Sequence, residues 1–413
     1  MRAIIVLFLA MLVFSCKETK VNSVSMKEDV SILANDSLNG RKTGSEGERK
    51  AAEYIAKRFA DIGLQAKGTD GYFQKFTFKA SKNPHQDAEF TSENNDSLTG
   101  ETGENVIAYL DNKAENTVVI GAHYDHLGMG GEGSLYREGD AIHNGADDNA
   151  SGVAMLLHLV DSLRFDSAQR PKNNNYLFIA FSGEEEGLLG SNYFVKNPTI
   201  DTKKVTYMLN MDMVGRLNAE KTLAVYGVGT SPILKQTVIA NAGDLNIVEN
   251  ESGVGSSDHT SFYLADIPVL HFFTGQHEDY HKPSDDTEKV NFEGMQIVSN
   301  YIFSIIKDLD NQQKLPFRKT QNESEMVPDF KVTLGVVPDY LFSGKGMRID
   351  GISEDRPAQK AGLQKGDIVV KMGEFEVTDM MSYMKSLSKF EKGQTAKVTI
   401  DRSGELKEVE VTF

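Results

Sequence analysis

Strand and helix signals alternate through the middle of this chain, and this alternation constrains the fold most. NTVVIGAHYDH has the apolar run of a buried strand, and SGVAMLLHLVDSL after it has the pattern of a helix. NYLFIAFSG, VTYMLNMDM and IPVLHFFTG are further strand signals, whereas GLLGSNYFVKN and NFEGMQIVSNYIFSIIKDL are helical. Parallel strands need long crossovers, which helices supply. The sequence therefore predicts an α/β fold with a mostly parallel, mixed sheet flanked by helices.

A helix is also expected near the start of the folded chain, from Ser45 to a stop at Gly63. Ser45 and Glu48 have the spacing of a capping box, in which each residue satisfies a backbone N–H of the other. Ile55 and Phe59 lie on one face of this helix, as expected for an amphipathic helix that packs on a core.

The 413 residues suffice for two or three domains. We expect one large domain over residues 17–310, with a polar and mostly irregular segment at 81–104. Residues 311–328 are polar and aperiodic, which is typical of a linker. Residues 329–413 contain several short strand signals and predict a small, β-rich second domain.

Residues 1–16 form a candidate secretion signal. Arg2 precedes an apolar stretch that is too short to span a bilayer comfortably. The ending LVFSC resembles a bacterial lipobox, in which the chain is cut before Cys16 and this residue is lipidated. The alternative is plain secretion with cleavage further along. We expect a cell-envelope protein, facing the periplasm or the outer surface, that touches the membrane only through this anchor.

The formal net charge is −16, which disfavours nucleic acid or an anionic membrane surface as the main partner. It suits a site that gathers cations. Cys16 is the only cysteine, so an intrachain disulfide is excluded.

Candidate metal ligands follow the predicted strands, at the points where the strands end. They are His123 and Asp125 in GAHYDH, Glu184 and Glu185 in FSGEEE, Asp212 in NMDM and, after a short loop, His281 in DYHKPSDD. Two further candidates, Asp147 and Asp148 in NGADDNASG, lie between the first two of these strands and just before a helix. Ligand sites in open α/β sheets lie beyond the carboxyl ends of the strands, so we expect these side chains to converge. Converging carboxylates and imidazoles need a cation, and this mixture of donors suits Zn²⁺.

Each motif alone has a simpler interpretation, as a surface histidine, a helix cap or a solvated run of charges. The ordered combination, with one motif at each strand end, makes a metal site the better hypothesis. The other histidines are expected to be hydrogen-bonded rather than ligating. They are His126, His143, His158, His259, His271 and His277.

On these motifs the chain resembles the dizinc aminopeptidase family of metallopeptidases, family twenty-eight of clan MH, which includes relatives of glutamate carboxypeptidase and glutaminyl cyclase. The resemblance covers about residues 26–310 and is carried by GAHYDHLG, NGADDNASG, FSGEEEGLLGS, NMDMVGR, SSDHTSFYLADIPVL and DYHKPSDD. It implies the zinc exopeptidase fold, two Zn²⁺ ions per chain and peptide substrates.

The resemblance also implies a role for each site residue. Its metal ligands are divided between two ions: His123 and Asp212 on one zinc, Glu185 and His281 on the other, and Asp148 bridging both. Glu184 would be the general base that activates water, and Asp125 would orient His123. Glu186 is expected to face solvent or a structural partner.

The activity that this resemblance implies is aminopeptidase hydrolysis through a zinc-activated water. Carboxypeptidase or dipeptidase specificity on the same site stays open, as does a glutaminyl cyclase-like acyl transfer, whose relatives use one zinc. A hypothesis of another class is a non-catalytic lipoprotein that binds peptides. Loss of a ligand or of the base would indicate it, and none is missing.

The C-terminal segment resembles a PDZ domain of the bacterial protease type. The resemblance rests on GISEDRPAQKAGLQKGDIVVKMGEFEV, with Pro357, Gly362, Gly366 and Asp367. PDZ domains add a peptide as an extra strand and hold its carboxylate on backbone N–H groups. Residues 333–336, TLGV, are the candidate carboxylate loop, although they depart from the usual glycine-rich loop. A C-terminal peptide ligand and a packing module that shapes access to the site both stay open.

Overall fold

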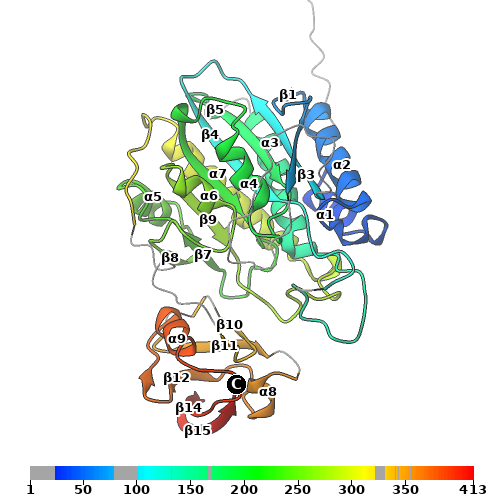
Figure 1. Ribbon diagram of the computed structural model, residues 1–413. Coiled ribbons are helices and arrows are strands. Elements are labelled where there is room, and N and C mark those ends of the chain that lie inside the picture. The colour runs from blue at the N-terminus through cyan, green and yellow to red at the C-terminus, as the bar shows by residue number, and fades with distance from the viewer. Residues whose placement is uncertain are drawn as a thin grey trace, which may run out of the picture.

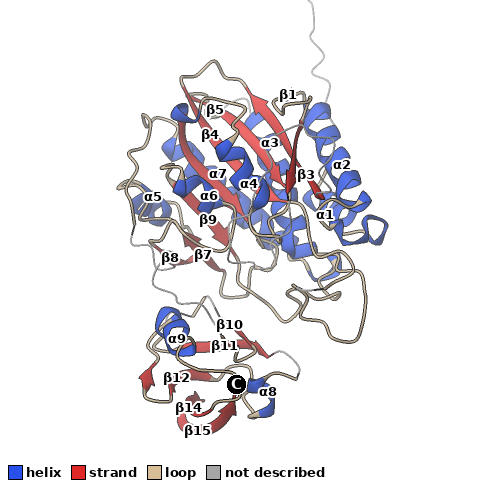
Figure 2. Ribbon diagram, in the orientation of Figure 1, coloured by secondary structure: helices blue, strands red, loops and turns tan. Residues whose placement is uncertain are grey.

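The computed structural model describes residues 24–78, 101–131, 133–165, 170–320, 331–339, 341–342, 344–352 and 355–413. The expected signal and lipobox at 1–16 lie outside the described residues, as do most of 81–104 and the end of the expected linker. The described chain forms two sheets, one in each of two domains, as Figures 1 and 2 show.

The larger sheet has its parallel strands at the centre. Its members are β1 (Gln65–Ala66), β2 (Phe73–Phe78), β3 (Glu101–Leu110), β4 (Asn116–His123), β5 (Asn174–Phe181), β6 (Val205–Met211), β7 (Thr222–Tyr226), β8 (Asn246–Asn250) and β9 (Val269–Phe273). The order is β1-β3-β5-β4-β6-β9-β7-β8, with β2 also paired to β3. Strands β5, β4, β6 and β9 are parallel to one another, whereas β3 and β7 join them antiparallel. The prediction of a mixed, mostly parallel sheet is confirmed.

Helices cover both faces of this sheet (Figure 2). They are α1 (Met26–Leu33), α2 (Glu46–Ile62), α3 (Gly152–Phe165), α4 (Leu189–Lys196), α5 (Leu234–Ala240), α6 (His259–Leu264) and α7 (Phe292–Leu309). Side chains alternate along β4, so that Val118 and Ile120 pack in the core with α2, α3 and α7, whereas Val119 packs in the core with α4 and α6. Burial on both faces explains the continuous apolar runs of the central strands.

The prediction for residues 101–104 was wrong, because they begin β3 rather than lying in a loop. They pair with β2 in a register that sets Glu101 opposite Phe78 and Glu104 opposite Lys75. Backbone pairing with a distant strand overrides the weak local preference of these polar residues for a strand.

Helix α2 begins and ends as expected. The Ser45 hydroxyl accepts from the Glu48 N–H at 3.2 Å, and Gly63 closes the helix with a left-handed φ of 83°. In a capping box the Glu48 carboxylate would also accept from the Ser45 N–H, and this part of the prediction is wrong. The carboxylate accepts instead from the Gly44 N–H at 2.6 Å and from the Ser182 hydroxyl at 2.5 Å. The bond with Ser182 ties α2 to the end of β5, and Glu48 is buried there. Burial raises the pKa of Glu48 to about 8.

The start of the expected linker packs against the larger domain. Leu315 is 2 % exposed, and its N–H donates to the Thr206 hydroxyl at 2.9 Å. The Arg318 N–H donates to the Thr230 carbonyl at 2.8 Å. Residues 311–320 therefore run along the larger domain rather than away from it.

The smaller domain is an antiparallel sheet with two helices and a core of its own. Its elements are β10 (Val336–Pro338), β11 (Met347–Ile352), α8 (Pro357–Lys360), β12 (Ile368–Met372), β13 (Phe375–Glu376), α9 (Met380–Leu387), β14 (Thr395–Arg402) and β15 (Glu405–Thr412). Leu334, Met347 and Val369 are among its fully buried side chains. Across the described residues, none of the helices of either domain has the length and apolar character needed to cross a membrane.

Candidate metal centre

The ligand-type residues converge at one edge of the larger sheet. Strands β4, β5, β6 and β9 run in the same direction, so their carboxyl ends meet there. The structure brings together all but one of the candidate side chains: His123, Asp125, Asp148, Glu184, Glu185, Asp212 and His281. The exception is Asp147, which points away from the donors. Their roles as ligands and base remain predictions, whereas their proximity is a structural finding.

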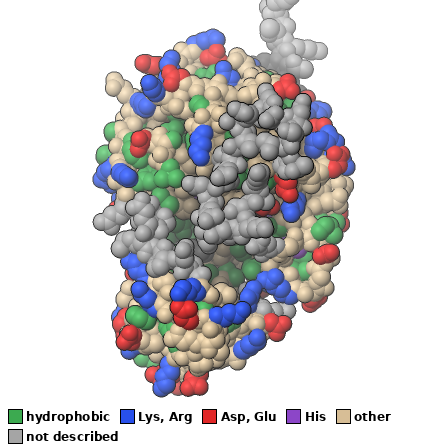
Figure 3. All heavy atoms as spheres, in the orientation of Figure 1, with side chains coloured by type: hydrophobic (Ala, Val, Ile, Leu, Met, Phe, Trp, Pro, Cys, Tyr) green, Lys and Arg blue, Asp and Glu red, His purple; other side chains and the backbone are tan. Residues whose placement is uncertain are grey.

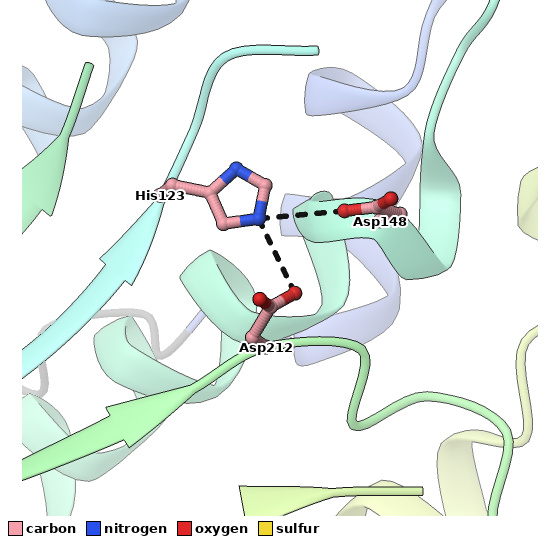
Figure 4. Close-up of side chains that lie close together, drawn as sticks. All are labelled: His123, Asp148 and Asp212. Carbon is pink, nitrogen blue, oxygen red and sulfur yellow. Dashed lines mark hydrogen bonds and ion pairs between the residues drawn. The ribbon is translucent and has the colours of Figure 1, made fainter. Parts of the chain in front are cut away.

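One group of donors forms around His123 (Figure 4). Its Nε2 lies 3.2 Å from Asp212 Oδ1 and 3.4 Å from Asp148 Oδ1. Its Nδ1 lies 3.3 Å from the Asp125 carbonyl oxygen and 3.6 Å from Asp125 Oδ1. Asp125 therefore faces the far nitrogen of the ring and orients it, which leaves Nε2 beside two carboxylates.

A second group forms on the other side of Asp148. Asp148 Oδ2 lies 3.1 Å from His281 Nε2, which in turn lies 3.3 Å from Glu185 Oε2. His281 Nδ1 faces the Gly133 carbonyl at 2.8 Å, so this nitrogen carries the proton and Nε2 is left to bind a cation. Asp148 thus has one oxygen in each group, the placement that a bridging ligand needs.

His126 belongs to this centre, although the sequence predicted only an ordinary hydrogen bond for it. Its Nδ1 lies 2.7 Å from Glu185 Oε1, and with Asp148 and Glu185 it forms one of the two donor groups that could hold a metal within the described residues. The other group is His123, Asp148 and Asp212. The sequence did contain a signal for His126: it lies three residues after His123, in the same strand-end motif.

Replacing His126 should weaken metal binding. Its ring holds one oxygen of Glu185 and leaves the other to face His281, so His126→Ala frees the carboxylate to rotate. We expect an increase of about 10–100-fold in the dissociation constant for zinc, measured by competition with a chromogenic chelator. His158→Ala is the matched control, because His158 lies on α3 and contacts Gln296 instead. Equal zinc affinity in both variants would contradict this role.

Asp125 also fixes the turn that carries the two glutamates. Its Oδ1 accepts from the Glu184 N–H at 3.1 Å and its Oδ2 from the Glu185 N–H at 3.3 Å. The Thr43 hydroxyl donates to the same carboxylate at 3.0 Å. One buried carboxylate therefore sets the position of both His123 and Glu184.

The two adjacent glutamates are in different electrostatic environments. Burial raises the pKa of Glu184 well above its usual value, and the nearby Asp212 raises it further, although His123 opposes this. Burial would also raise the pKa of Glu185, but His281 and His126 outweigh it and lower this pKa to about 2. Glu185 is thus held as a carboxylate, whereas Glu184 has the proton affinity that a general base needs. Glu186 is exposed, as expected.

Asp147 and Asp148 point in different directions despite being neighbours. Asp147 Oδ1 accepts from the Gly215 N–H at 2.6 Å and from the Ser151 hydroxyl at 3.0 Å, and its Oδ2 lies 3.1 Å from His277 Nε2. Asp147 therefore holds the loop after β6 instead of facing the donors. The N–H groups of both aspartates donate to Asp285 Oδ2, each at 3.0 Å.

Arg41 supports the loops that carry the centre, and no pattern in the sequence indicated this role. It is 1 % exposed and donates to the carbonyls of Leu33, Tyr124, Asn144 and Gly145. Its guanidinium therefore joins the loop after β4 to the loop before Asp148. Burial lowers the pKa of Arg41 to about 10, although Asp125 and Asp148 oppose this.

The donor set fits zinc. Each of the two groups offers an imidazole nitrogen and two carboxylates, the donors of catalytic zinc sites that keep a position for water. His123 and Asp148 are only 1 % and 3 % exposed, and buried charges of this kind are found paired or bound to metals.

Family models match parts of both domains. Peptidase family M28 matches residues 105–306, and the PDZ domain family matches residues 318–413. A probable leucine aminopeptidase of Trichophyton verrucosum (strain HKI 0517) is 33 % identical over 171 residues, which is 40 % of this chain and 44 % of the relative. Aminopeptidase YwaD of Bacillus subtilis (strain 168) is 27 % identical over 234 residues, 53 % of this chain and 47 % of the relative. The chain spans about half the length of the curated relatives that it matches.

Solved structures share the fold of the larger domain. BSAP, a zinc aminopeptidase from Bacillus subtilis, superposes with a TM-score of 0.53 at 17 % identity, covering 70 % of this chain and 94 % of its own. A glutaminyl cyclase from Porphyromonas gingivalis gives 0.52 at 17 % identity, covering 69 % and 97 %. Similarity at this level of identity establishes the fold.

Proposed function

Because residues 105–306 belong to peptidase family M28, we propose that this protein is a metal-dependent aminopeptidase that hydrolyses N-terminal residues from peptides. The observation that carries the proposal is the placement of Asp148, which has one oxygen beside His123 and the other beside His281. The complete set of ligands and base supports hydrolysis with two ions over the one-zinc chemistry of a glutaminyl cyclase.

The roles of the residues follow from their placement. His123, Asp148 and Asp212 would hold one zinc, and Asp148, Glu185 and His281 would hold the other, with His126 keeping Glu185 in place. Two bound Zn²⁺ ions would lower the pKa of a water and polarise the scissile carbonyl.

Glu184 would carry the proton. Its backbone is held by Asp125, so its carboxylate would be positioned to take a proton from water and pass it to the leaving amine. Asp125 keeps the His123 ring in one orientation, so that Nε2 faces the site throughout this transfer.

The direction of cleavage can be tested with purified protein and zinc on a panel of aminoacyl and N-blocked chromogenic peptides. Cleavage of free but not of blocked N-termini is the expected result. Hydrolysis of blocked peptides from their C-terminal end would favour a carboxypeptidase. Conversion of N-terminal glutamine to a cyclic product without chain cleavage would favour the cyclase alternative.

We also propose that the PDZ domain binds a peptide C-terminus. In the described residues β10 pairs only with β11, so its other edge is available for an added strand. Gly335 in the candidate carboxylate loop has φ +74°, and a Cβ there would lie 2.1 Å from Arg356 Cβ. Glycine is thus required at this turn.

The cell-envelope location remains a proposal, and it rests on the lipobox-like segment LVFSC, whose last residue is Cys16. Cys16→Ala should abolish incorporation of a labelled fatty acid and move the protein to the soluble fraction, because no lipid would then hold it to the membrane. Labelling and fractionation of cells that express either form provide the measurement. A wild-type protein without label, and with a mature N-terminus elsewhere, would refute the anchor.

A further inference from the structure

The PDZ domain contacts the larger domain beside the metal centre. Leu341 packs with Met213, just after β6, with Ala224 in the middle of β7, and with Phe273 at the end of β9. A Cβ on Gly275 would lie 2.6 Å from Leu341 Cδ1, so glycine at this position permits the approach. In Figure 1 the smaller domain lies next to β7 and β8. Leu341 thus acts as an apolar anchor between the domains.

A cleft of about 850 Å³ lies between the domains. The larger domain contributes residues 274–277 after β9 and residues 246–249 of β8, and the PDZ domain contributes Leu341, Asp350 and Lys365. This volume is within the range of about 300–1,000 Å³ that is common for ligand pockets. Residues 274–277 follow a strand whose carboxyl end is at the metal centre, so the cleft opens on the side where substrate must bind.

A second cavity, of about 300 Å³, adjoins the cleft at the boundary between the domains. His277, Asp350 and Lys365 border both spaces. Tyr280 lines the second cavity, and its ring stacks on the ring of His281 with centroids 3.8 Å apart. The two cavities therefore form a continuous track along the boundary between the domains, and one residue of its wall, Tyr280, contacts a predicted metal ligand.

The lining of the track suits the backbone of an extended peptide. Four consecutive residues of β8 border the larger cleft, and since successive side chains of a strand point to opposite faces, this places the cleft along the strand's edge. Within the described part of the chain, β8 pairs only with β7, which leaves that edge free for another strand.

Charged groups around the cleft are largely paired. Lys365 lies 3.1 Å from Asp350, and Arg216 lies 2.8 Å from Asp279. Figure 3 shows acidic and basic side chains interspersed on both domains on the face in view. The cleft therefore offers backbone hydrogen bonds rather than a strong field of one sign, as expected for a site that accepts many peptide sequences.

We propose that this interdomain cleft binds the part of a peptide substrate that follows the scissile bond. The inference rests on the proposed aminopeptidase function and adds a substrate class: peptides of several residues, in extended conformation, favoured over single-residue amides. The PDZ domain contributes to this site as one wall, held by Leu341.

The test compares a leucine chromogenic amide with a hexapeptide that begins with leucine, using the full-length zinc-loaded protein. Leu341→Asp replaces the apolar anchor by a charge. It should raise KM for the hexapeptide about tenfold, so that the ratio of kcat/KM between hexapeptide and amide falls by the same factor. Leu406→Asp is the matched control, because Leu406 is 67 % exposed on β15, and it should leave the ratio unchanged.

Lys365→Ala provides a second variant at the junction of the two cavities, in case Leu341→Asp perturbs folding. It should also raise KM for the hexapeptide selectively. A ratio equal to that of the wild type in both variants overturns the cleft as a substrate site. A wild-type enzyme that cleaves the amide but shows no preference for the hexapeptide overturns it too, and leaves the aminopeptidase function standing. Failure of the wild type on every free N-terminus overturns the proposed function itself.

Discussion

Glu184→Gln should lower kcat by about 10²–10⁴-fold while the protein keeps its full complement of zinc. Glutamine has the shape of glutamate but cannot accept a proton at the pH of the reaction. The contact that positions Glu184 runs through its backbone N–H to Asp125, so it survives the substitution. The donor groups around Asp148 do not include Glu184, so they should bind metal as before.

The measurement pairs turnover of a leucine chromogenic amide with metal content by elemental analysis. Glu186→Gln makes the same chemical change two residues along the chain, at an exposed position, and should leave both quantities at wild-type values. Near-normal turnover of Glu184→Gln with full metal occupancy would remove this residue from the role of base.

Asp148→Asn should cost the protein at least one of the two metal ions that we propose it binds and, with it, nearly all activity. Asp148 has one oxygen on the His123 side and the other 3.1 Å from His281. An amide cannot supply an anionic oxygen to each side. Two dications repel each other about four times as strongly as two unit charges at the same separation, and the bridging charge is what offsets this in a buried site.

Asp147→Asn is the matched variant, with the same chemical change in the adjacent residue. Asp147 contacts Gly215, Ser151 and His277 rather than the donor groups, so its loss should lower thermal stability and leave metal content near that of the wild type. Dialysis followed by elemental analysis separates the two variants. Full metal in Asp148→Asn together with depletion in Asp147→Asn would reverse the assignment.

The central parallel strands and the meeting of the site residues at their carboxyl ends could both be predicted from the sequence, for one reason. Central parallel strands are buried on both faces, so they appear as apolar runs, and a rule of topology brings their ends together. His123 and Asp212 could therefore be placed in one crevice from residue type and order alone.

What the sequence did not predict depends on partners that are distant along the chain. Residues 101–104 become a strand because β2 pairs with them, and β7 and β8 are short strands at one side of the sheet. Arg41 binds only backbone carbonyls, at separations of up to 104 residues. Carbonyls carry no sequence signature, so no local pattern indicated this arginine. Glu48 was expected to bond the Ser45 N–H, but it contacts Gly44 and Ser182, the latter 134 residues away.

The hydrogen bonds from Asp147 and Asp148 to Asp285 have a consequence for how the enzyme matures. They join segments 137 and 138 residues apart, and the loop that contains Asp285 also contains His281. Contacts this distant along the chain close only after large loops have been ordered, so they form late in folding. A chain in which β9 and the loop after it have not docked lacks His281 and the carboxylate of Asp285 that holds the Asp148 backbone. Tight zinc uptake should therefore follow the completion of the larger domain, and the rate of metal acquisition by refolding protein should report the last step of folding rather than collapse of the sheet.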